Sequence, residues 1–346
     1  MFDPKFTITN SINNSLLEIE RARGFLDAAK LKEDWIREMR SEFLLLETHH
    51  STHIEGTHLT LPQARNILAG APVAEVDKDD RQELLNYKEA MDLISKDLEK
   101  GAPITEDRIR QIHRTLVKDV RGGSLEPGQY RVLQNFIMNS RTREIVYTPP
   151  PPVLVPAMMK EFVDWLSREW DASAVIKAGI AQFHFVHIHP FLDGNGRTAR
   201  VLCTLVLYRS GYDFKRLFSL SEYYDADRKH YYDAIQSVRD SGMDHTAWLE
   251  YFCEGLRAQL LGVREKGEHA IRKDVMAEKT RKMPLNARQR KAVEYLIKNQ
   301  TIDNATYQKL FKVQRKTASR DLAELVELGI LIRSGERKGT RYSLKM

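Results

Sequence analysis

Apolar residues recur every three or four positions over most of the chain, which is the spacing of one face of an α-helix. The clearest run is Leu84, Tyr87, Met91, Ile94 and Leu98. Similar patterns predict helices within residues 10–50, from residue 61, and near 109–116, 158–166, 198–208 and 248–260. We therefore expect a mainly α fold.

One internal stretch departs from the helical pattern. Between Gly128 and Thr148 two short β-rich runs, 136–138 and 145–147, flank the turn-like Asn139-Ser140-Arg141. Such a pattern is typical of a β-hairpin. Four consecutive prolines, 149–152, close it.

The last part of the chain predicts a separate module. Helices are expected near 286–299, 303–311 and 315–328, and two short β-runs, 330–332 and 340–344, flank a glycine-bounded turn. Three helices followed by a hairpin predict a winged helix-turn-helix domain. We expect four regions: 1–100, an N-terminal helical region; 101–263, a catalytic domain; 264–283, a charged helical connector; and 284–346, the winged helix.

Composition adds the class of protein and its environment. The 346 residues are 42% hydrophobic and 29% charged, which is ordinary for globular domains. The chain has no apolar run near 18 residues and no signal-like start, so we expect a cytoplasmic protein without membrane association. Cys203 and Cys253 lie in apolar helical patterns, which predicts buried, reduced thiols.

The net charge of +6 is unevenly distributed. Residues 281–346 hold 16 Lys and Arg against 6 Asp and Glu, a difference of +10, so the remaining 280 residues carry about −4. A basic C-terminal module suggests an acidic partner, with nucleic acid as one candidate.

The densest chemistry lies between His189 and Arg200. The turn Gly194-Asn195-Gly196 precedes a buried helix. The first N–H groups of such a helix have no internal partner and its dipole favours negative charge, so this is an anion site. Arg197 and Arg200, three residues apart, are expected to grip phosphate oxygens together. Asp193 could hold Mg²⁺, and His189 could act as a general base.

These residues resemble the Fic family signature, His-Pro-Phe-x-(Asp/Glu)-Gly-Asn-Gly-Arg-x-x-Arg, at every fixed position. The resemblance implies a Fic helical bundle that moves AMP from ATP to a Ser, Thr or Tyr hydroxyl of a target protein, and of itself, releasing pyrophosphate. His189 would be the base and Asp193 the metal ligand. ATP and its phosphates would be held by Gly194, Asn195, Gly196, Arg197, Thr198, Ala199 and Arg200. A phosphate-donating branch has Lys at the place of Gly196. UMP or phosphocholine donors remain open.

A second stretch is similar to the family's inhibitory helix motif, (Ser/Thr)-x-x-x-Glu-(Gly/Asn). It runs from Ser51 to Gly56. The resemblance implies that Glu55 pairs with Arg200 and prevents ATP from binding productively. The alternatives are an ordinary helix end closed by Gly56, or removal of AMP at the same site with Glu55 positioning a water.

Two further elements carry weaker resemblances. The hairpin is similar to the Fic flap, which docks the target chain by strand addition, here through Ile137, Met138 and Asn139. Many relatives have Gly-Gly where this chain has Met138-Asn139. Tyr231 and Tyr232 are similar to a pair that lines the adenine pocket, although tyrosines at helical spacing are also ordinary core.

The basic residues of the last module and the histidine clusters suggest further partners and sites. Arg315, Lys316 and Arg320 would begin the recognition helix, so a DNA-binding regulator is an alternative function, and winged helices also dock proteins. A homodimer is expected from the resemblance. The histidines at 49, 50, 53 and 58 lack Cys or acidic ligands at a recognisable spacing, so they predict no metal site. Those at 184, 187 and 189 predict none either, because their apolar neighbours indicate a core helix and His189 is already assigned.

Overall fold

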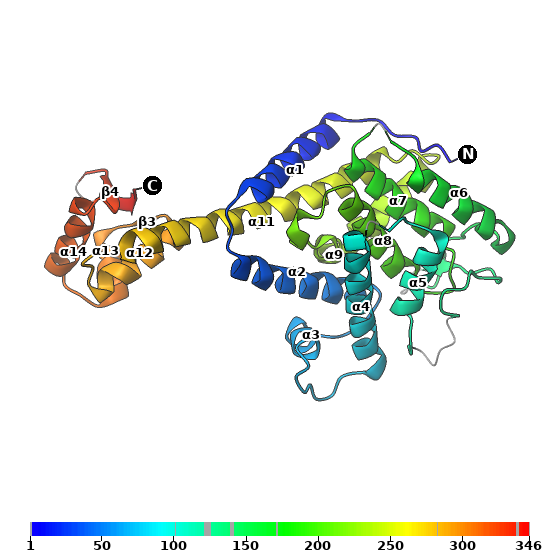
Figure 1. The fold of residues 1–346 in the computed structure, drawn as a ribbon, viewed down its shortest axis with the longest axis horizontal. Coiled ribbons are helices and arrows are strands. Elements are labelled where there is room, and N and C mark those ends of the chain that lie inside the picture. Colours follow the sequence, from blue (N-terminus) through cyan, green and yellow to red (C-terminus); the bar gives the residue numbers. More distant parts are fainter. Residues whose placement is uncertain are drawn as a thin grey trace. The chain divides into compact units, whose positions relative to one another are not determined.

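The computed structural model describes residues 2–100, 102–120, 126–138, 142–170, 172–281, 283–336 and 339–345 (Figure 1). The chain divides into two compact units. Unit 1 comprises Met1–Ala28 and Glu33–Val263, and unit 2 comprises Ala29–Lys32 and Arg264–Met346. Among the described residues, none of the helices combines the length and the apolar character needed to cross a membrane.

Unit 1 is helical, as the apolar spacing predicts. Its helices are α1 (Asn10–Ala28), α2 (Glu33–Ile54), α3 (Leu61–Leu68), α4 (Lys78–Lys100), α5 (Glu106–Leu116), α6 (Val155–Ser167), α7 (Ala174–Ile188), α8 (Asn195–Arg209), α9 (Leu220–Ala226), α10 (Arg228–Asp240) and the first part of α11 (Thr246–Arg281). The described residues of this unit also include two short 3₁₀ turns, η2 (Pro152–Leu154) and η3 (Phe214–Arg216). The predicted mainly α fold is confirmed.

The core of unit 1 is the pair α7 and α8, which lie side by side in Figure 1. Most residues of both helices are buried, including Gln182 and Thr204. The buried positions of α7 are mostly apolar, whereas α8 also buries polar residues such as Arg197 and Arg200. The loop between them carries the signature, so the candidate site lies at the junction of two core helices. Cys203 and Cys253 are free and buried, as predicted.

A buried carboxylate fixes α2 in place. Glu47, 5% exposed, accepts hydrogen bonds from the hydroxyls of Tyr87 (2.9 Å) and Ser219 (3.0 Å) and from the Ser221 N–H (3.0 Å). Because a buried carboxylate is costly unless its oxygens are satisfied, these donors hold α2 against α4 and the start of α9. The C-terminal end of α2, where Glu55 follows, is therefore anchored.

The predicted hairpin is present in the structure. Strand β1 (Ile137–Met138) pairs antiparallel with β2 (Ile145–Tyr147), with Ile137 opposite Tyr147 and Met138 opposite Ile145. The predicted turn, residues 139–141, lies outside the described residues, and so does Asn139 of the predicted docking strand.

Unit 2 contains the second part of α11, helices α12 (Ala287–Asn299), α13 (Asn304–Phe311) and α14 (Arg315–Glu327), and strands β3 (Thr301–Ile302), β4 (Leu331–Ser334) and β5 (Arg341–Leu344). The strands form an antiparallel sheet in the order β3-β5-β4. The predicted helix bounds agree with the structure to within one residue. Strand β3 was not predicted, because a two-residue strand has too few positions to show alternation. The predicted charged connector lies within α11, and the winged-helix assignment stays a prediction.

Candidate active site

His189 lies where α7 ends. Residues before a proline avoid the helical region, and here Pro190 follows a His189 that adopts a left-handed conformation (φ 51°). Its Nδ1 lies 3.3 Å from the Val186 carbonyl oxygen, so Nδ1–H donates there and Nε2 is left as the proton acceptor. Burial lowers the pKa of His189 to about 4. The imidazole is therefore neutral at physiological pH, as a general base requires.

Asn195 shapes the loop that follows. Its side-chain oxygen accepts from the Phe191 N–H (2.9 Å) and its amide nitrogen donates to the Phe191 carbonyl (2.8 Å). Asn195 is 2% exposed. The sequence predicts a phosphate contact for this residue, but in the structure its side chain closes the loop. What remains for a phosphate is its backbone N–H in the first turn of α8.

His113 of α5 supports the same loop and was missed by the sequence analysis. Its Nδ1 accepts from the Gly128 N–H (2.9 Å), so its Nε2 carries the proton and donates to the Asp193 carbonyl (2.9 Å). The ring stacks on Phe191 at 3.7 Å, and burial lowers its pKa to about 4. The only sequence signal was its place beside the apolar positions of α5, which indicated packing.

The start of α8 is open to an anion. Gly194, at the N-cap, has a φ of 74° and provides no side-chain cap. The Glu55 carboxylate lies against the next turn residue: a Cβ built on Gly196 would lie 2.2 Å from Glu55 Oε1. A larger residue at position 196 would therefore require the Glu55 carboxylate to move from its present place at this helix N-terminus.

Arg200 holds that carboxylate. Its Nη2 lies 2.8 Å from Glu55 Oε1 and 2.9 Å from the Ser51 carbonyl, and its Nε donates to Ser51 Oγ at 2.7 Å. The Arg200 side chain is 3% exposed. Although burial alone would lower the pKa of Arg200, the Glu55 charge raises it. The pairing that the inhibitory motif implies is thus present in the structure.

Arg197 has other partners than Arg200, and the predicted shared phosphate clamp stays a prediction. Its Nη1 lies 2.7 Å from Glu83 Oε2, with the two side chains 1% and 4% exposed, and its Nη2 lies 3.8 Å from Asp193 Oδ1. Helix α4 supplies Glu83, a partner that sequence spacing could not reveal. The guanidinium is used within the protein interior.

The polar groups of Thr198 are bonded within α8, and the phosphate role of Thr198 and Ala199 stays a prediction. The N–H and the hydroxyl of Thr198 both donate to the Gly194 carbonyl, at 2.9 and 2.8 Å. Both residues are fully buried within α8. The Thr198 hydroxyl is therefore used inside the helix.

The predicted adenine pair divides between core and surface. Tyr231 is 2% exposed and stacks on Tyr224 at 4.3 Å, with its hydroxyl accepting from Gln182 Nε2 (3.3 Å). Tyr232 is 50% exposed. Only Tyr232 therefore presents a ring surface to a ligand.

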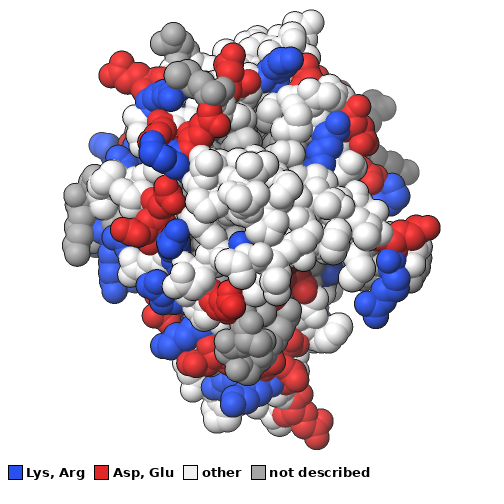
Figure 2. All heavy atoms as spheres, turned by 90° about the vertical axis from the view of Figure 1, so that its right-hand side faces the viewer, with Lys and Arg blue, Asp and Glu red and all other residues white. Residues whose placement is uncertain are grey.

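The residues around the hairpin are apolar and exposed. They are Val132, Leu133, Phe136, Met138, Ile145, Val146, Val153 and Leu154. Figure 2 shows one face of the molecule on which uncharged side chains gather at the centre, with charged side chains around them. Exposed apolar area of this kind marks an interaction surface. Met138, one of the predicted docking residues, is 51% exposed, whereas Ile137 is half-buried.

The potential metal ligands of the chain are its His, Cys, Asp and Glu side chains. Among the described residues, no group of three or more His, Cys, Asp or Glu is arranged to hold a metal ion. His50 and His53 instead each bond Asp225 Oδ2 at 2.7 Å. The Asp193 side chain is 29% exposed and its Oδ1 accepts from the Gly194 N–H (2.6 Å). One partly exposed carboxylate beside an anion site suits a magnesium ion carried by phosphates.

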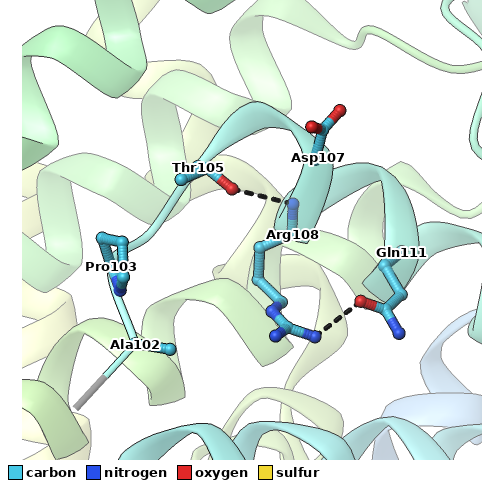
Figure 3. A pocket seen from close by; sticks show the side chains of 6 residues that line it. All are labelled: Ala102, Pro103, Thr105, Asp107, Arg108 and Gln111. Atoms are coloured by element: carbon cyan, nitrogen blue, oxygen red, sulfur yellow. Dashed lines mark hydrogen bonds between the residues drawn. The ribbon is translucent and has the colours of Figure 1, made fainter.

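A separate hollow of about 210 Å³ lies at the start of α5 (Figure 3). Thr105 caps the helix there by accepting from the Arg108 N–H, and Arg108 Nη1 donates to Gln111 (2.5 Å). None of the predicted site residues lines it. We therefore assign it no part in the site.

Comparison with known proteins agrees with this geometry. Residues 103–207 match the Fic/DOC family, and this segment includes the whole signature and the hairpin. The chain contains a Fic domain. Protein adenylyltransferase Fic of Drosophila willistoni is 32% identical over 200 residues, which are 57% of this chain and 38% of that protein. The chain thus spans well under half the length of the curated relatives it matches.

Solved structures share the fold. A Fic family protein from Desulfovibrio desulfuricans G20 superimposes with a TM-score of 0.65 at 23% identity, covering 99% of this chain and 98% of that one. Fic-1 from C. elegans gives a TM-score of 0.62 at 25% identity, covering 76% and 73%. These similarities confirm the predicted Fic helical bundle.

Proposed function

We propose that this protein is a protein adenylyltransferase that uses ATP, and that Glu55 holds it in an inhibited state. The observation that carries the proposal is the Glu55 carboxylate at the first turn of α8, paired with Arg200 at 2.8 Å. A carboxylate there occupies the place where an anionic ligand would bind. His189, with a neutral imidazole and an available Nε2, belongs to the same loop.

The reaction follows from these groups. The hydroxyl oxygen of the target attacks the α-phosphorus of ATP, while His189 Nε2 accepts the hydroxyl proton. The bond between the α-phosphorus and the oxygen bridging to the β-phosphate breaks, and pyrophosphate leaves. The first-turn N–H groups of Gly196 and Arg197 and the Arg200 guanidinium would stabilise the phosphate charge. The relatives named protein adenylyltransferase Fic support this chemistry.

Asp193 would hold Mg²⁺ bound to the phosphates, where the ion would neutralise charge. Tyr232 would offer its exposed ring to the adenine. The hairpin residues Ile137, Met138 and Asn139 would add a strand to the target chain. Self-modification and a homodimer are further expectations of this proposal, and the target protein is defined only as one that presents a hydroxyl.

The position of the label in ATP tests the chemistry. The Glu55→Gly variant is given Mg²⁺ with ATP labelled at the α- or at the γ-phosphate, and label on protein is measured. We expect α-label to be incorporated and γ-label to be absent, since pyrophosphate leaves. Glu55→Gly combined with His189→Ala should lose the α-label, because a positioned base contributes ~10²–10⁴ in rate.

Other outcomes would redirect the proposal. Incorporation of γ-label would mean phosphoryl transfer. If no label appears although ATP binds, the reaction is transfer from another donor such as UTP, or removal of AMP, which the wild-type chain should then catalyse on an AMP-modified target. The last result would also require Glu55 for activity, the opposite of inhibition.

A second candidate function, binding of duplex DNA by unit 2, is favoured by the arrangement of its charges. Arg315, Lys316 and Arg320 are exposed on α14, and only Arg320 approaches a carboxylate, Glu324 at 3.8 Å, among the ion pairs of the described residues. Asp321 is buried and accepts from Arg288 (2.9 Å) and Tyr307 (3.0 Å). Asp321 is thus turned inward, while the three cations face solvent. Arg337 and Lys338, the predicted wing tip, lie outside the described residues.

Salt dependence distinguishes DNA contacts from general attraction. The full chain is titrated into a labelled duplex at several salt concentrations, and binding is followed by fluorescence anisotropy. Replacing Arg315, Lys316 and Arg320 by alanine should weaken binding and reduce the slope of log K against log salt by about 3, close to 0.9 per phosphate contact.

The matched control also removes three exposed cations. It replaces Arg37, Lys160 and Lys229, which pair with carboxylates in unit 1. Both triple variants have the same net charge. Equal effects of the two would contradict a specific role of α14 and leave only nonspecific attraction.

A further inference from the structure

Arg131 lies between the hairpin and the catalytic loop. The residue is 1% exposed, although it carries a charge. Its Nε donates to the His189 carbonyl (2.8 Å), its Nη1 to the Leu133 carbonyl (3.3 Å) and its Nη2 to the Pro150 carbonyl. Its backbone N–H donates to the Pro190 carbonyl (2.9 Å). One guanidinium therefore bonds the loop of the catalytic base and both ends of the hairpin.

The environment of Arg131 is unusual for a buried cation. Among the residues that the structure describes, no carboxylate pairs with it, and its donors are satisfied by backbone carbonyls. Buried charges are expensive unless they are paired or fully hydrogen-bonded. The planar, forked donors of arginine can reach several carbonyls at once, which a lysine ammonium cannot do with the same geometry. Removing the guanidinium would leave these carbonyl oxygens unsatisfied.

We propose that Arg131 is a positioning residue that couples the target-docking hairpin to His189. It sets the backbone of His189 and the two ends of the hairpin in one fixed relation. A target strand aligned on the hairpin is thereby aligned with Nε2 of the base. This inference rests on the proposed transfer reaction. It assigns to a residue outside the signature the alignment of the target hydroxyl with His189 Nε2.

Charge gives the proposal a second readout. Arg131 and Arg239 both lower the pKa of His189, and Glu55 raises it, against a background in which burial has the largest effect. Arg131→Lys keeps the positive charge but loses the planar set of N–H donors, whereas Arg131→Met loses both the charge and the donors. Loss of the charge raises the His189 pKa, so the rate should begin to fall at a higher pH as the solution is acidified.

The test uses the Glu55→Gly chain and measures self-labelling from α-labelled ATP between pH 4 and 7. We expect each Arg131 variant to lose about 10²-fold in rate, the cost of a displacement of about 1 Å, with an unchanged half-saturating ATP concentration. The pH at which the rate falls on acidification should be unchanged in Arg131→Lys and higher in Arg131→Met. Arg65→Lys, which changes a surface partner of Glu42, serves as the control and should match the parent.

Hydrogen exchange tests the coupling without relying on activity. In Arg131→Lys, peptides that cover Leu133, Pro150 and His189 should lose protection together, while α1 and α3 keep theirs. If these peptides lose protection together but the Glu55→Gly parent chain incorporates no label, the coupling is upheld and the transfer reaction is refuted. The proposal is overturned if the hairpin and His189 peptides respond separately or not at all. It is also overturned if both variants lose label only in proportion to unfolded protein and their rates fall at the same pH on acidification.

Discussion

Replacing Glu55 by glycine is expected to raise incorporation of α-label by about 10²-fold over wild type. The Glu55 carboxylate engages Arg200 at 2.8 Å and fills the space beside Gly196. Its removal leaves the place beside Arg200 and the first turn of α8 to the phosphates, while Ser51 continues to hold the guanidinium. Correct placement of a reacting group by about 1 Å has an effect of this size. Glu55 follows the last residue of α2, so glycine there does not interrupt the helix.

Two conservative variants separate charge from shape. Glu55→Gln keeps the size of the side chain and can still accept from Arg200, so we expect a smaller increase than with glycine. Glu42→Gln changes a carboxylate of the same helix that pairs with surface Arg65, and it should leave labelling unchanged. An inhibitory role of Glu55 is excluded if Glu55→Gly binds ATP, retains its fold and labels no faster than wild type.

Replacing Glu83 by glutamine is expected to lower the free energy of unfolding of unit 1 by about 3–5 kcal/mol. Glu83 and Arg197 form a buried pair at 2.7 Å, and removing one partner leaves the other charge without compensation in the interior. Among the ion pairs of the described residues, Arg197 would retain the more distant one with Asp193, at 3.8 Å. Urea denaturation followed by circular dichroism measures the change.

The double variant Glu83→Leu with Arg197→Met is the comparison. Apolar residues of similar volume in place of a buried pair are often neutral or stabilising, so most of the lost stability should return. A large loss in the single variant with recovery in the double variant would establish that Arg197 serves the interior. If Glu83→Gln is as stable as wild type while ATP binding weakens, Arg197 belongs to the phosphate site after all.

Local sequence determined the helices, the hairpin and the central loop. Apolar spacing is a property of neighbouring residues, so the bounds of α12 to α14 and the pairing of β1 with β2 could be predicted closely. The signature between His189 and Arg200 also lies within one short stretch, which is why its resemblance to the Fic family could be recognised without coordinates. The family motif even indicated the distant pairing of Glu55 with Arg200, although no local rule requires it.

Tertiary structure decided how each polar side chain of that stretch is used. Arg197 and Arg200 are equivalent in the sequence, but α4 presents Glu83 to one and α2 presents Glu55 to the other. His113 and Arg131 support the loop from other elements through bonds to backbone carbonyls, which leave no pattern in the sequence. Hydrogen-bond partners and burial depend on which elements pack together, and packing brings together residues far apart along the chain. The sequence therefore determined where the chemistry lies, and only the packing of the helices decided which side chains remain available for it.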